Sequence, residues 1–194
     1  MAPSEQASTA PARRNHGPLG ARPAYLLLED GSRFEGFSVA HHDVAVGEVV
    51  FTTSMSGYQE TVSDPSYRGQ IVVFTYPLVG NYGVAERHME SDRIHARAVV
   101  MREGVDCEDS PTAEAGWLSW LCDCGVPALS GVDTRALVRH IRDKGAMRGG
   151  VFPADVPEQR ARELIAAEPP MAGRDLVGEV TPAQPHDLPP ADGV

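Results

Sequence analysis

The densest group of polar side chains in the sequence lies between residues 52 and 67. It comprises Thr52-Thr53-Ser54-Met55-Ser56-Gly57-Tyr58-Gln59-Glu60 and Ser63-Asp64-Pro65-Ser66-Tyr67. Hydroxyl and amide groups beside a glycine and a proline can form a loop that orients a polar small molecule without adding charge. The same residues also fit a turn in which Asp64 and Ser66 bond to their own backbone. Chemistry alone favours the turn.

A second polar segment, Gly80-Asn81-Tyr82-Gly83, follows an apolar run. Proteins with α/β folds often place ligands at such positions. The segment is not a phosphate loop, because no lysine and no G-x-G-x-x-G pattern accompanies it. We therefore expect a turn in which glycine supplies a positive φ.

Two short groups contain residue types that bind metals: His41-His42-Asp43 and Cys122-Asp123-Cys124. Adjacent residues on a strand point to opposite faces, and neither group has a second ligand pair at suitable spacing, so we predict no metal site. With Cys107 the cysteines number three, which suggests no disulfide framework and fits a reducing, cytoplasmic setting.

The one strongly basic stretch begins at Asp133-Thr134-Arg135 and continues through Arg139, His140, Arg142 and Lys144, with Arg148 beyond it. The whole chain has a net charge of -10 and a pI near 5.1. This balance predicts a solvated face or a contact with an acidic protein partner, and it argues against a nucleic-acid partner. The longest apolar runs, such as 71–74, are far too short to cross a bilayer, so we expect no membrane partner.

The elements that must position these residues are strands in the first half of the chain. Ala24–Leu28 and Arg33–Phe37 flank Asp30-Gly31 and predict a β-hairpin. Further strands are expected at residues 48–52, 70–76 and 95–101. Residues 71–74 are apolar on both faces, which indicates a central, covered strand.

The second half of the chain has helical spacing. Ser110 and Pro111 predict a helix that ends before Gly125, with a stripe of Trp117, Leu118, Leu121 and Cys122. A second helix is expected from Thr134 to Lys144, capped by Asp133 and closed by Gly145, and a third at 158–167. A short strand at 149–152 completes an α+β layered domain.

The length of 194 residues predicts one folded domain with two tails. Residues 1–23 contain four prolines and almost no acid, which predicts a disordered extension. We place the domain at residues 24–167. Residues 168–194, which are rich in proline, are expected to form a linker.

A series of motifs in this order closely resembles the amino-terminal domain of the carbamoyl-phosphate synthase small subunit, from about Ala24 to Thr181. The motifs are Leu28-Glu29-Asp30-Gly31, the segment from Gly47 to Glu60, Asp64-Pro65-Ser66-Tyr67, Gln70-Ile71-Val72, Thr75-Tyr76-Pro77, Gly80-Asn81-Tyr82-Gly83, Gly131-Val132-Asp133-Thr134-Arg135 and Arg142-Asp143-Lys144-Gly145-Ala146.

The resemblance implies a swivelling β/β/α layered domain and a role in an enzyme complex. In that family the small subunit hydrolyses glutamine, and the ammonia travels to a large subunit that makes carbamoyl phosphate from bicarbonate and ATP with Mg²⁺, for the arginine and pyrimidine pathways. The same domain docks on the large subunit. The resemblance places Ser66 at the glutamine pocket that the two small-subunit domains share.

The sequence departs from the family at the catalytic cysteine. The amidotransferase domain uses a cysteine in a Gly-x-Cys-x-Gly elbow together with a later histidine, and no such elbow is present in this sequence. Cys107, Cys122 and Cys124 instead have carboxylate neighbours, which raise a thiol pKa. We therefore expect no catalytic residue and no bound cofactor in this chain, and an amidotransferase domain that is missing from it.

Two hypotheses of function follow. In the first, the chain is part of an enzyme and works only together with an amidotransferase domain and a large subunit. In the second, it is a non-catalytic interaction module that retains only the docking surface.

Overall fold

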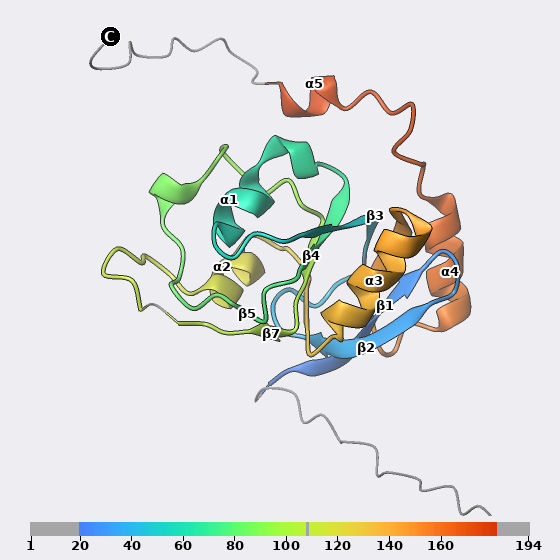
Figure 1. Ribbon diagram of the computed structural model, residues 1–194, viewed down its shortest axis with the longest axis horizontal. Coiled ribbons are helices and arrows are strands. Elements are labelled where there is room, and N and C mark those ends of the chain that lie inside the picture. Colours follow the sequence, from blue (N-terminus) through green and yellow to red (C-terminus); the bar gives the residue numbers. More distant parts are fainter. Residues whose placement is uncertain (1–19, 108, 182–194) are drawn as a thin grey trace, which may run out of the picture.

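The computed structural model describes residues 20–107 and 109–181 (Figure 1). Residues 1–19 of the predicted extension (1–23) and residues 182–194 of the predicted linker (168–194) lie outside the described residues. Strand β1 begins at Arg22, inside the segment that we expected to be an extension, and Arg22 pairs with Ser38.

Seven strands close into a barrel in the order β1-β2-β8-β6-β4-β3-β9. Their bounds are β1 Arg22–Leu28, β2 Arg33–Ser38, β3 Ala45–Thr52, β4 Gln70–Phe74, β6 Ala98–Val100, β8 Ala128–Ser130 and β9 Met147–Pro153. Strands β5 (Leu78–Val79) and β7 (Glu103–Gly104) form a separate two-stranded sheet. The predicted hairpin and the four other predicted strand regions are confirmed.

The barrel has two different edges, because β3, β4, β6 and β8 run parallel to one another. We call the residues that follow these strands (53–57, 75–77, 102 and 131–135) the carboxyl edge. We call the residues that lead into β4, β6 and β8 (65–69, 93–97 and 124–127) the amino edge. In Figure 1, β5 and β7 lie in the lower half of the domain and α5 lies above the domain.

Helices cover the barrel. They are α1 Tyr58–Ser63, α2 Trp117–Asp123, α3 Thr134–Lys144, α4 Glu158–Ala167 and α5 Val177–Val180, with 3-10 turns η1 Pro65–Tyr67 and η2 Glu86–His88. The predicted α3 and α4 are confirmed, including the Asp133 cap, whose carboxylate accepts from the backbone N–H of Ala136 at 2.9 Å. Helix α1 was not predicted.

The predicted start of α2 was wrong. The helix begins at Trp117, whereas Ser110 accepts a backbone bond from Ala113 in a separate turn. The cap comes from a residue distant in the chain, since Oδ1 of Asp106 accepts from the backbone N–H groups of Leu118 at 2.8 Å and Ser119 at 3.2 Å. A local capping signal could not reveal this tertiary contact.

Strand β4 lies between two apolar clusters. Ile71 and Val73 are buried in the cluster that α3 covers, and Val72 and Phe74 are buried in the cluster that α1 and α2 cover. A third cluster joins β1 and β9 to α4. The prediction that 71–74 is central and covered on both faces is therefore confirmed.

The fold is mixed α and β, with strands mostly in the first half of the chain and helices later, as predicted. The layered, swivelling arrangement is not confirmed, because the main sheet closes into a barrel, and that description stays a prediction. Within the described ranges, no helix is long and apolar enough to cross a membrane.

Candidate functional site

The two polar segments that the sequence indicated lie against each other. Gly57, with φ of 78°, starts α1 and donates its backbone N–H to Oη of Tyr82 at 2.7 Å. In return, Oη of Tyr58 donates to the carbonyl of Gly83 at 2.7 Å. The two tyrosine rings stack with centroids 4.3 Å apart. Burial raises the pKa of both hydroxyls, so both stay protonated.

Most other polar side chains of α1 are also satisfied internally. The amide of Gln59 donates to the carbonyl of Ala85 and accepts from its N–H, both at 2.9 Å. The hydroxyls of Thr61 and Ser63 donate to carbonyls of their own helical turn. These groups hold the fold together and leave little for a ligand to bind.

Ser66 differs from these residues. Oδ1 of Asp64 accepts from the backbone N–H of Ser66 at 2.8 Å, which confirms the expected turn for the Asp64 side chain but not for the Ser66 hydroxyl. The Ser66 residue is exposed, and among residues 20–107 and 109–181 its hydroxyl has no hydrogen-bond partner. The structure thus places a free hydroxyl at the amino edge, on η1.

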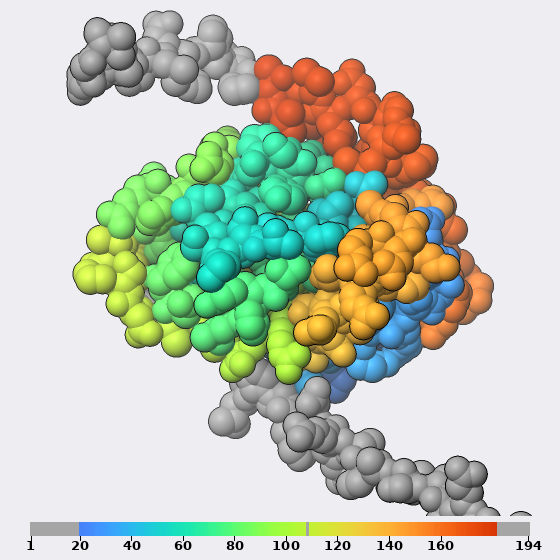
Figure 2. Space-filling model, viewed as in Figure 1, coloured from blue at the N-terminus to red at the C-terminus, as the bar shows by residue number. Residues whose placement is uncertain are grey.

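Residues 168–181, here called the tether, pass along the same edge. The Glu168 carboxylate pairs with Nη1 of Arg97 at 3.0 Å and with Nη1 of Arg174 at 2.9 Å, and its side chain is only 14% exposed. Figure 2 shows the tether in red along one side of the domain. An ion pair this sheltered from water is screened less than one on the open surface.

The far end of the tether has a second attachment. Nη2 of Arg68 lies 2.9 Å from Oε2 of Glu179, and Arg93 donates to the Glu179 carbonyl at 2.9 Å. The hydrogen bond from Arg68 is the main reason that the pKa of Glu179 is lowered. Arg68 follows η1 directly, so this attachment lies two residues from Ser66 in the chain. A segment that was expected to be a linker is therefore fixed beside Ser66.

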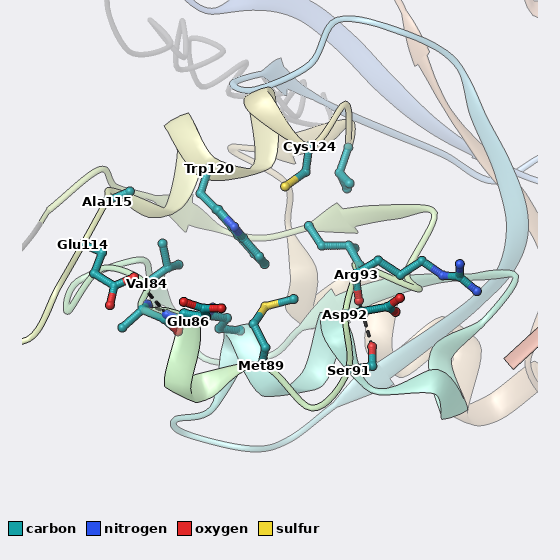
Figure 3. A pocket seen from close by; sticks show the side chains of 14 residues that line it. Val84, Glu86, Met89, Ser91, Asp92, Arg93, Glu114, Ala115, Trp120 and Cys124 are labelled. Atoms are coloured by element: carbon teal, nitrogen blue, oxygen red, sulfur yellow. Dashed lines mark hydrogen bonds between the residues drawn. The ribbon is translucent and has the colours of Figure 1, made fainter. Parts of the chain in front are cut away.

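A cavity with a volume of about 790 Å³ lies between α1, α2 and η2 (Figure 3). Trp120 and Cys124 point into it from one side and Met89 points in from the other. Burial, and then the neighbouring Asp123, raise the pKa of the Cys124 thiol, as predicted from its sequence neighbours. A protonated thiol beside apolar walls is not an activated nucleophile.

The candidate metal residues do not form a cluster in the part of the chain that the structure describes. No group of three His, Cys, Asp or Glu side chains is placed there to hold an ion. Nε2 of His41 lies 3.9 Å from Oδ2 of Asp43, and the two side chains are 44% and 68% exposed. Cys122 and Cys124 are both exposed free cysteines.

Residues 26–151 match a family model described as the carbamoyl-phosphate synthase small chain, CPSase domain. The chain belongs to this family. The match includes Ser66, the α1 region and the whole carboxyl edge.

Carbamoyl phosphate synthase small chains from three bacteria show the extent of the similarity. The protein of Chlorobaculum tepidum is 44% identical over 86% of this chain and 45% of its own length. Those of Caldanaerobacter subterraneus and Thermotoga maritima are 51% and 43% identical, over 64% and 84% of this chain and 35% and 42% of their own lengths. The chain therefore spans less than half of the length of these family members.

Reasoning from the sequence missed two features of this region. Glu168 and Glu179 lie in a segment read as a linker, although its alternation of acidic residues with Arg174 was a signal of ordered ion pairs. Arg97 was read as part of a strand, and only the strand order brings it to the amino edge beside Arg68.

Proposed function

We propose that this chain forms the amino-terminal part of the small subunit of a glutamine-dependent carbamoyl-phosphate synthase. In this role it docks on the large subunit, which uses ATP and Mg²⁺, and it helps to form the glutamine pocket together with an amidotransferase domain. The complex supplies carbamoyl phosphate for arginine and pyrimidine synthesis, and free cysteines are in keeping with a cytoplasmic location.

The observation that supports this proposal most directly is the free hydroxyl of Ser66. The neighbouring polar groups of α1 are bonded within the domain, whereas Ser66 is exposed within the family match. The tether brings the chain that follows α4 to the same edge. A domain that follows the tether would then be well placed to share a pocket with Ser66.

We expect the chain alone to release no ammonia from glutamine. The Cys124 thiol has a raised pKa, and Cys107 and Cys122 also lack the helix N-terminus and histidine that activate a nucleophile. A glutaminase assay on the purified chain tests this. Turnover that disappears on mutation of Cys122 or Cys124 would contradict it.

The Ser66 role is tested in a complex reconstituted with an amidotransferase domain and the large subunit. Ser66→Ala removes one hydrogen bond, worth about 0.5 to 1.5 kcal/mol, so the glutamine requirement should rise up to about tenfold. Synthesis driven by added ammonia should stay unchanged, because ammonia bypasses the glutamine pocket. Ser66→Phe should obstruct the pocket and have a larger effect.

Ser119→Ala is a matched control, since Ser119 is also exposed but lies on α2, outside both edges. It should leave the glutamine requirement unchanged. Equal impairment of glutamine-driven and ammonia-driven synthesis by Ser66→Ala would reject the substrate contact. That result would favour a module that only docks.

A further inference from the structure

Three arginines surround a hollow at the carboxyl edge. Arg102 follows β6, and Arg135 and Arg139 lie on the first turns of α3, which follows β8. The hollow has a volume of about 380 Å³ and is also lined by Thr75, Pro77 and Thr134. Thus segments that follow three different strands of the barrel converge on one positively charged site.

Within the described part of the chain, these arginines have no carboxylate partner. Among residues 20–107 and 109–181, no Asp or Glu oxygen lies within 4.0 Å of the guanidinium groups of Arg102, Arg135 or Arg139. Asp133 is close in the chain, but its Oδ1 caps α3 by accepting from the N–H of Ala136. All three arginines are exposed. Their hydrogen-bonding groups are therefore open to a partner.

The charge of this site contrasts with that of the chain as a whole. A net charge of -10 repels acidic partners from most of the surface, so a local positive cluster selects where such a partner can approach. The amino end of α3 adds a partial positive charge. Planar guanidinium groups bind carboxylates through paired hydrogen bonds. The site is therefore chemically suited to a carboxylate-bearing ligand.

Apolar side chains extend the same edge. Met55 follows β3 and is 74% exposed, and Tyr76 follows β4 and is 37% exposed. They are two of the three exposed large hydrophobic residues in the described chain; the third, Val177, lies in the tether. Arginine, tyrosine and methionine are enriched at the centres of protein interfaces. This composition indicates a protein partner and not a small anion.

We propose that the carboxyl edge is a docking surface for an acidic segment of a partner protein. Arg102, Arg135 and Arg139 bind carboxylates of that segment, while Met55 and Tyr76 pack against its apolar residues. Under the proposed function the partner is the large subunit, and to that extent this inference rests on the proposed function. Docking at this edge leaves the amino edge, with Ser66 and the tether, available to an amidotransferase domain.

The test measures binding of the large subunit to the chain and to two charge-reversed variants. Arg135→Glu and Arg139→Glu should each weaken binding by about tenfold or more, because each places a repelling carboxylate in the hollow. Lys144→Glu is the matched control, since Lys144 is exposed on the same helix but does not line the hollow. It should change the affinity by less than about twofold.

The outcomes separate the inference from the proposed function. If the large subunit binds all three variants as tightly as the unmodified chain, docking occurs elsewhere and the inference is wrong, while the proposed function stands. If the unmodified chain fails to bind the large subunit, the docking part of the proposed function is wrong.

If the unmodified chain does not bind the large subunit, a second experiment tests the docking surface by itself. A synthetic peptide of alternating Glu and Leu is titrated into the chain while backbone NMR shifts are followed. Shifts at Arg102, Arg135 and Arg139 that disappear in Arg135→Glu but persist in Lys144→Glu support the docking surface. Shifts elsewhere, no shifts, or equal shifts in Arg135→Glu overturn it.

Discussion

Arginines lie at both edges of the barrel, but only those at the amino edge have carboxylate partners among the described residues. At the amino edge, Arg68 and Arg97 are paired with Glu179 and Glu168 of the tether. At the carboxyl edge, Arg102, Arg135 and Arg139 have no carboxylate partner among the described residues. Arginine therefore stabilises the domain at one edge and remains open to a partner at the other. Loss of the ion pairs at the amino edge should therefore cost stability, and loss of the arginines at the carboxyl edge should cost binding of the partner.

The largest loss of stability is expected for Gly47→Ala near the amino edge. A Cβ at Gly47 would collide with the backbone carbonyl of Gly69, which cannot move without disturbing β4. We expect the free energy of unfolding to fall by about 1–3 kcal/mol. Gly178→Ala, where a Cβ meets nothing, is the control and should leave stability unchanged. Equal stability of the two variants in urea denaturation would contradict close packing at this edge.

A smaller loss is expected for Glu168→Gln, which leaves Arg97 and Arg174 without their carboxylate. The free energy of unfolding should fall by about 1–2 kcal/mol, because these groups are largely sheltered from water. Trypsin should also cleave faster at Arg174. Glu163→Gln, in an exposed pair with Arg160, is the matched control. An unchanged cleavage rate in Glu168→Gln would show that the ion pairs do not hold the tether.

Acid should loosen the tether. The hydrogen bond from Arg68 lowers the pKa of Glu179 below its ordinary value of 4.5. The ionised Glu179 therefore stabilises the attachment of the tether fully above pH 4.5. This stabilisation is lost as the pH falls through the lowered pKa. Backbone NMR relaxation of residues 175–181 should show greater motion at about pH 3 than at about pH 6. In Arg68→Gln the motion should already be high at the higher pH. If residues 175–181 of the unmodified chain moved equally at both pH values, the Arg68–Glu179 pair would not hold the tether.

The smallest effect on stability is expected for Arg135→Ala and Arg139→Ala. Neither side chain has an ion pair with any described residue, so the free energy of unfolding should change by less than about 0.5 kcal/mol. Thermal denaturation measures this directly. A loss as large as that of Glu168→Gln would mean that these arginines have a structural role.

Local signals predicted the elements well where both ends of an element are encoded nearby. Helix α3 was predicted to the residue, because Asp133 caps it, Leu137 and Ile141 form its stripe and Gly145 ends it. The start of α2 was mispredicted because its cap, Asp106, comes from a residue that only the fold brings close. Helix α1 was hidden because Tyr58 bonds to Gly83 and Gln59 bonds to Ala85, and only the fold brings these partners close.

The candidate site was less predictable than the fold. Ser66 was nominated by family resemblance, since its own chemistry favoured a simple turn. The basic residues of α3 were recognised in the sequence, but Arg102 was not linked to them. The strand order β4-β6-β8 brings Arg102 beside Arg135, and single-sequence periodicity carries no information on that order.

The most direct test of the division between the two edges compares glutamine-driven and ammonia-driven synthesis in one reconstituted complex. Ser66→Ala should raise only the glutamine requirement, by up to about tenfold. Arg135→Glu should lower both activities in parallel, and a higher concentration of the chain should restore both, because only assembly is weakened. If the two variants produced the same pattern, the edges would not have separate roles and the division would be wrong.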